Sequence, residues 1–430
     1  MNPRLVLAGS VTGAVIVALD GTVLTVAQPT LQRDLGATFA QVQWTSTGYL
    51  VAVASLLVFA GRLGDRYGHR RLFGIGMLGF GITSAGIGTA PGVGWVIGLR
   101  VAQGVFGALL QPATLGMLRA AYPADRLRGP IAVRTAAIGV AAAVGPLVGG
   151  VLVAGSGWRA VFFVNVVPAL VFGVLALAVR EPETAAEVRL DLPGAALLAV
   201  TLGFLVHTLV SPHWFGLAVT AVAGTAFVRH ERLAESPLIP RAVPGPPLGV
   251  LVAASAALSG TLFVSTYVLQ YTLGLDPFQS ALRCLPLAVL MVAAAAVCPV
   301  LLRRAGARRT TATAMAVLAV GILVLSRASG AGTLGAGFAL LGAGFGTVMV
   351  AATHVVVRES PVGAAGVAGG LQQTAMNVGP TLGVALAATE VSLVAFAAVA
   401  LAGAALSAGF RSRTADQGQP GNRSRVPARR

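Results

Sequence analysis

Long apolar stretches separated by short polar breaks run along almost the whole chain. Most stretches continue for about 20 residues, the length that an α-helix needs to cross a bilayer. Their apolar residues are continuous and do not alternate, so helices are favoured over a β-barrel. The pattern predicts an all-α polytopic membrane protein with about fourteen spans, near 5–27, 42–61, 71–90, 95–118, 129–153, 160–179, 192–210, 214–229, 247–272, 278–302, 310–327, 331–356, 364–389 and 391–410.

Composition and charge support the same class. The 430 residues are 56% hydrophobic and 10% charged, whereas a soluble protein carries about a quarter charged residues. The net charge of +16 comes from Arg alone, because the chain contains no Lys. In a soluble protein this balance would suggest nucleic-acid binding. Here the Arg lie in the breaks between spans, where the positive-inside rule accounts for them, so we expect no nucleic-acid partner.

The distribution of Arg also predicts the topology. About 24 of the 30 Arg lie in breaks and tails on the side of the N-terminus, against three on the opposite side, Arg33, Arg159 and Arg327. We therefore expect a multi-pass protein of the plasma (inner) membrane with both termini cytoplasmic. The first apolar stretch has no small-residue cleavage site and is interrupted by Asp20, so it is predicted to be a span and not a signal peptide.

Two short motifs repeat along the chain at nearly the same interval. Gly145-Pro-Leu-Val-Gly149 returns as Gly379-Pro-Thr-Leu-Gly383, and Gly68-His-Arg-Arg71 returns as Gly306-Ala-Arg-Arg309. Two homologous six-helix halves around an inserted pair form a transporter architecture. The expected domains are an N-terminal half at 1–180, a two-helix linker at 181–245, a C-terminal half at 246–410 and a disordered basic cytoplasmic tail at 411–430.

Asp20 is the one carboxylate deep within a predicted span. Helix rise places it about 8 Å from the membrane surface opposite the N-terminus, and Arg100 lies equally deep from that surface. Charges inside a bilayer are costly and usually face water, a partner or a substrate path. Two interpretations remain open. Asp20 is either a titratable group that couples proton movement to transport, with Arg100 biasing its protonation, or part of a structural ion pair or interfacial group.

Other polar residues in the spans are weaker candidates. Arg134 is expected to extend to the inner surface, and Arg283 either does the same or complements an anionic substrate. Cys284 and Cys298 lie about 21 Å apart on one predicted helix, too far for a disulfide. Amides in the spans line a substrate cavity or bond neighbouring helices; the cavity candidates are Gln103, Gln111, Gln270, Gln373 and Asn377.

Motifs of enzymes and of cofactor sites are missing from the sequence. It contains no HExxH, no phosphate-binding Gly-Lys loop and no nucleophile elbow. We therefore expect no enzymatic activity, no catalytic residue, no metal and no cofactor.

The residues 61–72, GRLGDRYGHRRL, form a charged stretch predicted as a short loop between two spans. Positive-inside anchoring explains its Arg but not Asp65 or the spacing of its glycines. The stretch resembles the cytoplasmic loop between helices 2 and 3 of the major facilitator superfamily, although His69 stands where that family usually has Arg or Lys. The matching positions are Gly61, Leu63, Asp65, Arg66, Gly68, Arg70 and Arg71.

Further stretches resemble the fourteen-helix drug:proton antiporter branch of that superfamily. Residues 19–29 are similar to its helix 1 motif, with Thr25 in place of Asn, which adds Thr25 to the cavity candidates. Residues 100–104 match its helix 4 Arg motif, and residues 158–168 and 191–194 match later motifs. A Pro that bends the helix and glycines that allow close packing resemble its helix 5 antiporter motif; these are Gly145, Pro146, Gly149 and Gly150.

The resemblance implies a major facilitator fold with two six-helix halves and two extra central helices. It implies export of small amphipathic drugs, antibiotics or toxic metabolites by alternating access, driven by the proton gradient through Asp20 and Arg100. The stretch around Asp65 would dock on the start of a second-half helix and stabilise the outward-open state. Expected partners are the lipid bilayer, protons and a small-molecule substrate, with no obligate protein partner. Transport of one endogenous metabolite, in either direction, and non-transporting sensing remain alternatives.

Overall fold

The computed structural model describes residues 3–123, 126–178, 191–210, 213–234, 237, 245–328, 330–359, 365–387 and 392–410. Within these ranges all regular elements are helices, as the hydrophobic pattern predicts. The predicted tail 411–430 lies outside the described residues, as do 179–190 and most positions of 235–244. The proposed domain boundaries in those segments therefore stay predictions.

Six helices form the N-terminal half, and a further pair follows them. The first six are α1 (Pro3–Asp34), α2 (Phe39–Tyr67), α3 (His69–Gly88), α4 (Val93–Ala121), α5 (Arg128–Ser156) and α6 (Ala160–Ala178). The pair consists of α7 (Leu192–Val210) and α8 (Trp214–Leu233). The remaining helices are α9 (Gly245–Tyr267) with a π-helical turn (Val268–Thr272), α10 (Pro277–Ser326), α11 (Ala331–Glu359), α12 (Ala365–Ala387) and α13 (Leu393–Leu406).

Nine of the described helices are long and apolar enough to cross a membrane, or ten if the bent α5 counts as one span. The described α10 contains a break, because Gly306 has φ 75° and ψ 164° inside it. Two predicted spans, 278–302 and 310–327, therefore appear as the two arms of α10 on either side of this glycine.

The charged stretch 61–72 is not a loop. α2 continues to Tyr67 and α3 begins at His69, which leaves Gly68 alone between them with φ 90°. A glycine adopts this backbone conformation without a steric penalty, whereas the neighbouring Arg are good helix formers. Polarity was therefore the wrong guide to secondary structure here, and the helical ends reach further than the apolar pattern predicts. α1 likewise ends at Asp34 and not near residue 27.

The repeat detected in the sequence is visible in the backbone geometry. Gly306 breaks α10 with positive φ just as Gly68 separates α2 from α3. At the preceding turns Gly36 and Gly274, separated by the same interval, both have positive φ. Capping boxes then start α2 at Thr38 and α10 at Asp276, and this interval is again the same. The two halves therefore use the same turns and caps.

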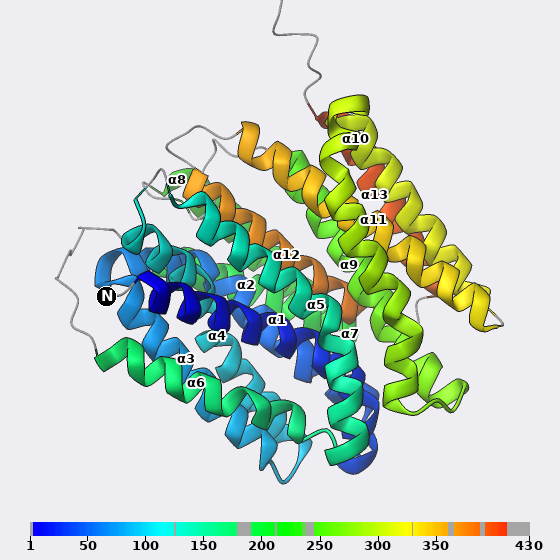
Figure 1. Ribbon diagram of the computed structural model, residues 1–430, viewed down its shortest axis with the longest axis horizontal. Coiled ribbons are helices and arrows are strands. Elements are labelled where there is room, and N and C mark those ends of the chain that lie inside the picture. Colours follow the sequence, from blue (N-terminus) through cyan, green and yellow to red (C-terminus); the bar gives the residue numbers. More distant parts are fainter. Residues whose placement is uncertain are drawn as a thin grey trace, which may run out of the picture.

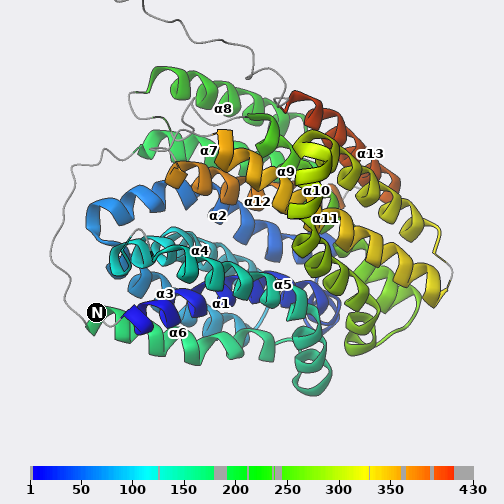
Figure 2. The same cartoon turned by 45° about the horizontal axis from the view of Figure 1, so that its top comes forward.

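The two halves lie side by side in both views, α1–α6 in one and α9–α13 in the other (Figure 1). Each has its own apolar core, built around Phe73 and Phe80 in the first half and Phe263 and Phe338 in the second. The halves meet where α5 packs on α10 and α2 packs on α12. Figure 2 shows α7 beside α2 and α12, with α8 packed against α7 on its outer side.

A carboxylate ties the α7–α8 pair together. Asp191 caps the start of α7, where its Oδ1 accepts from the Gly194 N–H over 2.9 Å. The same oxygen lies 2.7 Å from Nε2 of His230 near the end of α8. Because a carboxylate is favourable at a helix N-terminus, this contact serves both the cap and the packing of the pair.

Candidate functional site

A buried ion pair lies inside the N-terminal half. Arg100 Nη1 on α4 donates to Asp20 Oδ2 on α1 over 2.6 Å, and each residue is only 1% exposed. The sequence placed the two at equal depth, and the structure brings them into direct contact. Neither side chain is open to the surroundings of the bundle, which removes the interfacial interpretation of Asp20. Whether the pair couples protons is a separate question, which the geometry alone leaves as a prediction.

Side chains and backbone from five helices hold this pair. Arg100 Nε donates to the Thr45 carbonyl on α2 over 2.9 Å, and Nη1 also donates to Gln103 Oε1 over 2.5 Å. Gln103 Nε2 donates in turn to Ser84 Oγ on α3 over 2.7 Å. Asn165 Nδ2 on α6 lies 3.4 Å from Asp20 Oδ1. Such charge-assisted bonds fix the orientation of the guanidinium in a low-dielectric interior.

Aromatic rings cover the faces of the guanidinium. The Arg100 Cζ lies 4.3 Å from the centroid of the Tyr49 ring and 5.9 Å from that of Phe162. A cation above such a ring is attracted by the ring quadrupole, most strongly when water is excluded. The Tyr49 hydroxyl is buried and has no hydrogen-bond partner among the described residues. Arg100 therefore keeps favourable contacts that do not depend on Asp20.

The contacts of the pair define what a change of charge on Asp20 would do. Protonation of Asp20 removes the charge that neutralises Arg100 and leaves the guanidinium on the Thr45 carbonyl, Gln103 and Tyr49. Because a buried cation without a counter-charge is costly, the protonated state favours any rearrangement that gives Arg100 water or an anion. The site thus links the charge of one carboxylate to the packing of five helices.

The coupling within the pair is measurable as stability. The Arg100→Met variant leaves Asp20 buried without a cation, and we expect it to lose about 3–5 kcal/mol of stability. Adding Asp20→Asn should restore most of that loss, since two neutral groups then face each other. Thermal unfolding of the parent, both single variants and the double variant in one detergent gives the comparison. Equal midpoints for Arg100→Met and the double variant would show that the pair is not coupled.

The predicted cavity residues do not form a hydrogen-bonded cluster. Gln103 belongs to the ion-pair network, and Gln270 donates to the Val26 carbonyl of α1 over 3.0 Å. Asn377 is buried and donates to the Gln373 carbonyl on its own helix, and Thr25 donates to Gly21 in the same way. Within the described residues, no hydrogen bond joins two of these side chains, and the Gln111 side chain makes none. A shared cavity stays a prediction.

The charged stretch between α2 and α3 is closed by its own histidine. His69 Nε2 lies 3.0 Å from Asp65 Oδ1, and the Asp65 side chain is 56% exposed. The His69 ring packs against Gly64 of α2 and Gly116 of α4, so it fills space in its own half. In the described part of the chain, Asp65 has no partner in the second half. Docking of Asp65 there was expected for a different conformation and stays a prediction.

The glycine-proline stretch of α5 bends the helix and allows two close contacts. The axes of 129–142 and 144–156 differ by 46°, and Pro146 cannot donate to the Ala142 carbonyl four residues earlier. Gly145 and Gly149 face α1, at Thr22 and Val23. A Cβ at Gly150 would lie 2.9 Å from the Phe278 Cα on α10. Gly150 therefore permits a close approach between the halves.

The halves are joined at the side of the bundle opposite the N-terminus. Three side chains donate there to backbone carbonyls of the other half: Gln43 to Val384, Gln270 to Val26, and Tyr271 to Pro29, over 3.0, 3.0 and 3.1 Å. Phe39 of α2 packs edge-on against Tyr267 of α9, with ring centroids 4.9 Å apart. The described residues therefore show a bundle that is closed on this side.

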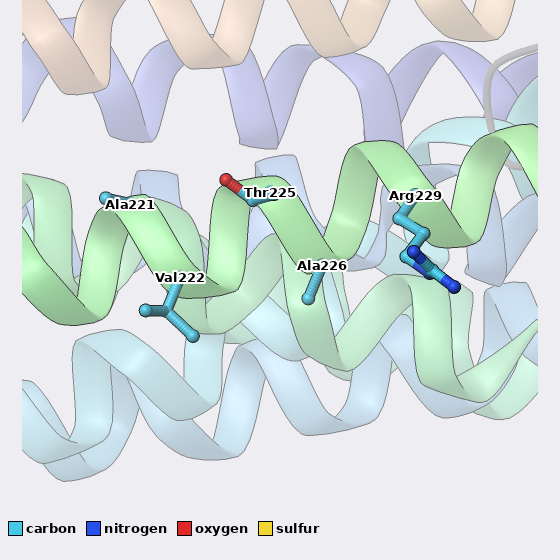
Figure 3. A pocket seen from close by; sticks show the side chains of 5 residues that line it. All are labelled: Ala221, Val222, Thr225, Ala226 and Arg229. Atoms are coloured by element: carbon cyan, nitrogen blue, oxygen red, sulfur yellow. The ribbon is translucent and has the colours of Figure 1, made fainter.

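A shallow surface groove of about 430 Å³ lies elsewhere, on the inserted pair. Figure 3 shows its lining along one face of α8, from Ala221, Val222, Thr225 and Ala226 to Arg229. It does not involve the ion pair or the contact between the halves.

Sequence reasoning missed several groups of the site. Thr45 contributes a backbone carbonyl, which no side-chain pattern reveals. Ser84 and Tyr49 were available as polar positions within predicted spans, at depths close to those of Asp20 and Arg100. A search for all polar groups at one depth would have found them.

Comparison with known proteins gives the family. Residues 11–384 match the Major Facilitator Superfamily. The tetracenomycin C resistance and export protein of Streptomyces glaucescens is 41% identical over 396 residues, which cover 87% of this chain and 73% of the relative. The puromycin resistance protein of Streptomyces alboniger is 34% identical over 394 residues, covering 86% and 78%. The probable actinorhodin transporter of Streptomyces coelicolor is 33% identical over 412 residues, covering 89% and 71%.

The fold agrees with that family. The crystal structure of the POT family transporter PepTSo superposes with a TM-score of 0.71 at 14% identity and covers 95% of this chain and 98% of its own. A sulfate complex of the peptide transporter POT gives 0.66 at 15% identity, with 94% and 93% covered. At these identities the likeness shows the fold alone. Together with the sequence match, it establishes that this multi-pass membrane protein belongs to the Major Facilitator Superfamily.

Proposed function

We propose that this protein is a proton-coupled exporter of small amphipathic drugs, antibiotics or toxic metabolites that works by alternating access. The observation that carries the proposal is the buried Asp20–Arg100 pair, a titratable carboxylate held by five helices in the half that must move. Ionisable groups inside membrane segments are rare and costly, and they typically mark ion or substrate pathways.

The proposed mechanism depends on protonation of the Asp20 carboxylate. With Asp20 charged, the pair is neutral overall and favours the compact packing of α1, α4 and α6. When a proton binds Asp20, Arg100 loses its counter-charge, and the resulting cost favours a rearrangement of the N-terminal half against the other half. Proton uptake on one side and release on the other would thus drive the halves through their cycle.

Direction and substrate class rest on the relatives and on the closed side of the bundle. Three relatives are named for resistance to or transport of antibiotics. The excess of Arg in the breaks on the side of the N-terminus supports an orientation with both termini in the cytoplasm. We propose the plasma membrane as the location. In that orientation the joined side faces outward, so the described conformation is the one that receives substrate from the cytoplasm.

We also propose fourteen spans and hence the fourteen-helix branch. The break of α10 at Gly306 supports two spans within that helix, as Gly68 separates α2 and α3. The α7–α8 pair accounts for the difference from a twelve-span protein: α7 is among the helices long and apolar enough to cross a membrane, whereas α8, 20 residues long, is assigned as a span by its length alone. Such a length is enough to cross the hydrocarbon core with little tilt.

Survival of an efflux-deficient bacterial host tests the function directly. We expect cells that express the parent chain to tolerate several structurally unrelated amphipathic compounds at higher concentrations than cells with an empty vector. A protonophore should restore accumulation of those compounds, because the gradient is the energy source. Protection against a single compound would indicate one endogenous substrate. No protection, with the protein present in the membrane, would contradict drug export and favour uptake or sensing.

A further inference from the structure

Arg134 on α5 is a second cation inside the N-terminal half, with surroundings unlike those of Arg100. Its Nε donates to Thr114 Oγ1 on α4 over 3.0 Å, and the residue is only half-buried. Thr114 is fully buried, and its hydroxyl donates to the Gln111 carbonyl over 2.8 Å. Ser10 of α1 donates to the Thr114 carbonyl over 2.8 Å. Three helices therefore build the place at which Arg134 is held.

The bond between Arg134 and Thr114 joins equivalent levels of two neighbouring helices, and the expected reach of the guanidinium to the inner surface stays a prediction. Arg134 lies six residues after the start of α5, and Thr114 lies seven residues before the end of the antiparallel α4. Both positions are therefore about 10 Å from the ends of their helices. The bond to Thr114 therefore runs across the bundle at nearly constant depth and holds the Nε of Arg134 at that level.

Arg134 has no carboxylate partner among the described residues. The described carboxylates in ion pairs have other partners: Asp20 pairs with Arg100, Asp34 with Arg159, Asp65 with His69, and Asp191 with His230. Some described polar atoms are fully buried and make no hydrogen bond. The terminal nitrogens of Arg134 do not belong to this group. A cation in the membrane region that is held but not neutralised is a functional candidate, with an anion as its partner.

The amide of Gln111 completes the surroundings. Gln111 is half-buried on α4, one turn before Thr114, and its side chain makes no hydrogen bond within the described residues. A guanidinium offers paired N–H donors that match a carboxylate, and the amide of Gln111 on the neighbouring helix can supply a further N–H donor. The partly buried guanidinium and amide thus present donors on neighbouring helices: Thr114 accepts from the Arg134 Nε and donates to the Gln111 backbone carbonyl, which leaves the Gln111 amide unbonded among the described residues.

We propose that Arg134 and Gln111 form a binding site for the carboxylate or another anionic group of an amphipathic substrate that enters from the N-terminal side. The inference rests on the proposed export function and adds a charge preference to it. The joined side of the bundle lies at the other end of α5, around Gly150, so the site is on the side where the described residues show no hydrogen bond between the halves.

Binding of a matched pair of aromatic probes tests the site without transport. The probes are 2-naphthoate and its neutral amide, 2-naphthamide, titrated by calorimetry into protein in nanodiscs of zwitterionic lipid. We expect the parent to bind the naphthoate at least tenfold more tightly than the amide. Arg134→Gln should weaken naphthoate binding by about ten- to a hundredfold, the usual effect of losing a charge-assisted bond, and leave the amide unchanged. Arg134→Lys should retain part of the preference.

Arg283→Gln is the matched control, because Arg283 is an exposed Arg in a span of the second half. Loss of naphthoate binding in this variant but not in Arg134→Gln would overturn the assignment, and so would equal affinity of the parent for the two probes. If Arg134→Gln does not fold, chemical modification of the parent with phenylglyoxal tests the site instead. Naphthoate should protect Arg134 from the reagent, and unprotected labelling would contradict the site. Asp20→Asn should still bind naphthoate, which separates failure of this site from failure of proton coupling.

Discussion

Gly150→Leu is expected to abolish transport while leaving the protein in the membrane. The Gly150 Cα faces α10 so closely that an added Cβ would lie 2.9 Å from both the Phe278 Cα and the Pro277 carbonyl oxygen. Backbone atoms cannot move aside as a flexible side-chain end can, so a leucine forces α5 and α10 apart. The closed side of the bundle then cannot form, and the alternating cycle loses one of its two states.

Gly155→Leu provides the control on the same helix, since nothing lies within 4 Å of a Cβ added there. Spin labels at Arg33→Cys and Leu273→Cys, in a background without the two native cysteines, report the distance between the halves on the closed side. We expect Gly150→Leu to lengthen this distance and Gly155→Leu to leave it unchanged. A normal distance with normal transport in Gly150→Leu would refute the role of this contact.

Asp20→Asn should eliminate export driven by a pH gradient while preserving substrate exchange at equal pH on both sides. Asparagine keeps the shape of aspartate and an oxygen that accepts from Arg100, but it cannot gain or lose a proton in this pH range. The variant therefore resembles a permanently neutral state, in which binding and movement of the halves continue without coupling. Both activities are measured in proteoliposomes with the compound that the parent exports best.

Asp34→Asn is the control for Asp20→Asn. Asp34 lies at the end of the same helix with its side chain 45% exposed, where it accepts from Trp158 and pairs with Arg159. We expect this variant to lose little stability, as is usual for exposed ion pairs, and to export normally. Gradient-driven export that survives Asp20→Asn would remove this carboxylate from the coupling mechanism.

The repeated architecture could be predicted from the sequence because glycines occupy equivalent turns that need an unusual backbone conformation. Gly68 and Gly306 occupy equivalent places in the two halves, and both adopt positive φ between helices. The helical character of 61–67 could not be predicted from hydropathy, because the end of a helix can leave the membrane without leaving the helix. Hydrophobic pattern reports burial in lipid, while backbone hydrogen bonding decides where a helix ends.

The candidate site was predictable in its charged members and not in its supporting groups. Asp20 and Arg100 stand out because charges inside a span are rare and costly, and equal depth indicated that they could meet. Gln270 looked like a cavity residue, but a π-helical turn directs it to the Val26 carbonyl in the other half. An irregular turn of this kind changes which face a side chain occupies, and composition does not predict it.

For Arg134, too, the sequence did not predict which group the side chain contacts. Sequence depth predicts a side chain near the inner surface but gives no partner for it, whereas the structure shows a hydroxyl on a neighbouring helix bonded to its Nε. The packing of α1, α4 and α5 decides that contact, and no local pattern contains it.

Proton movement during export tests the central claim most directly. The parent chain is reconstituted in proteoliposomes that contain a pH-sensitive dye, with no initial pH gradient, and a gradient of an exported compound is imposed. The account predicts that substrate flux moves protons in the opposite direction, and that Asp20→Asn moves substrate without protons. Substrate flux through the parent with no change of internal pH would contradict proton-coupled export.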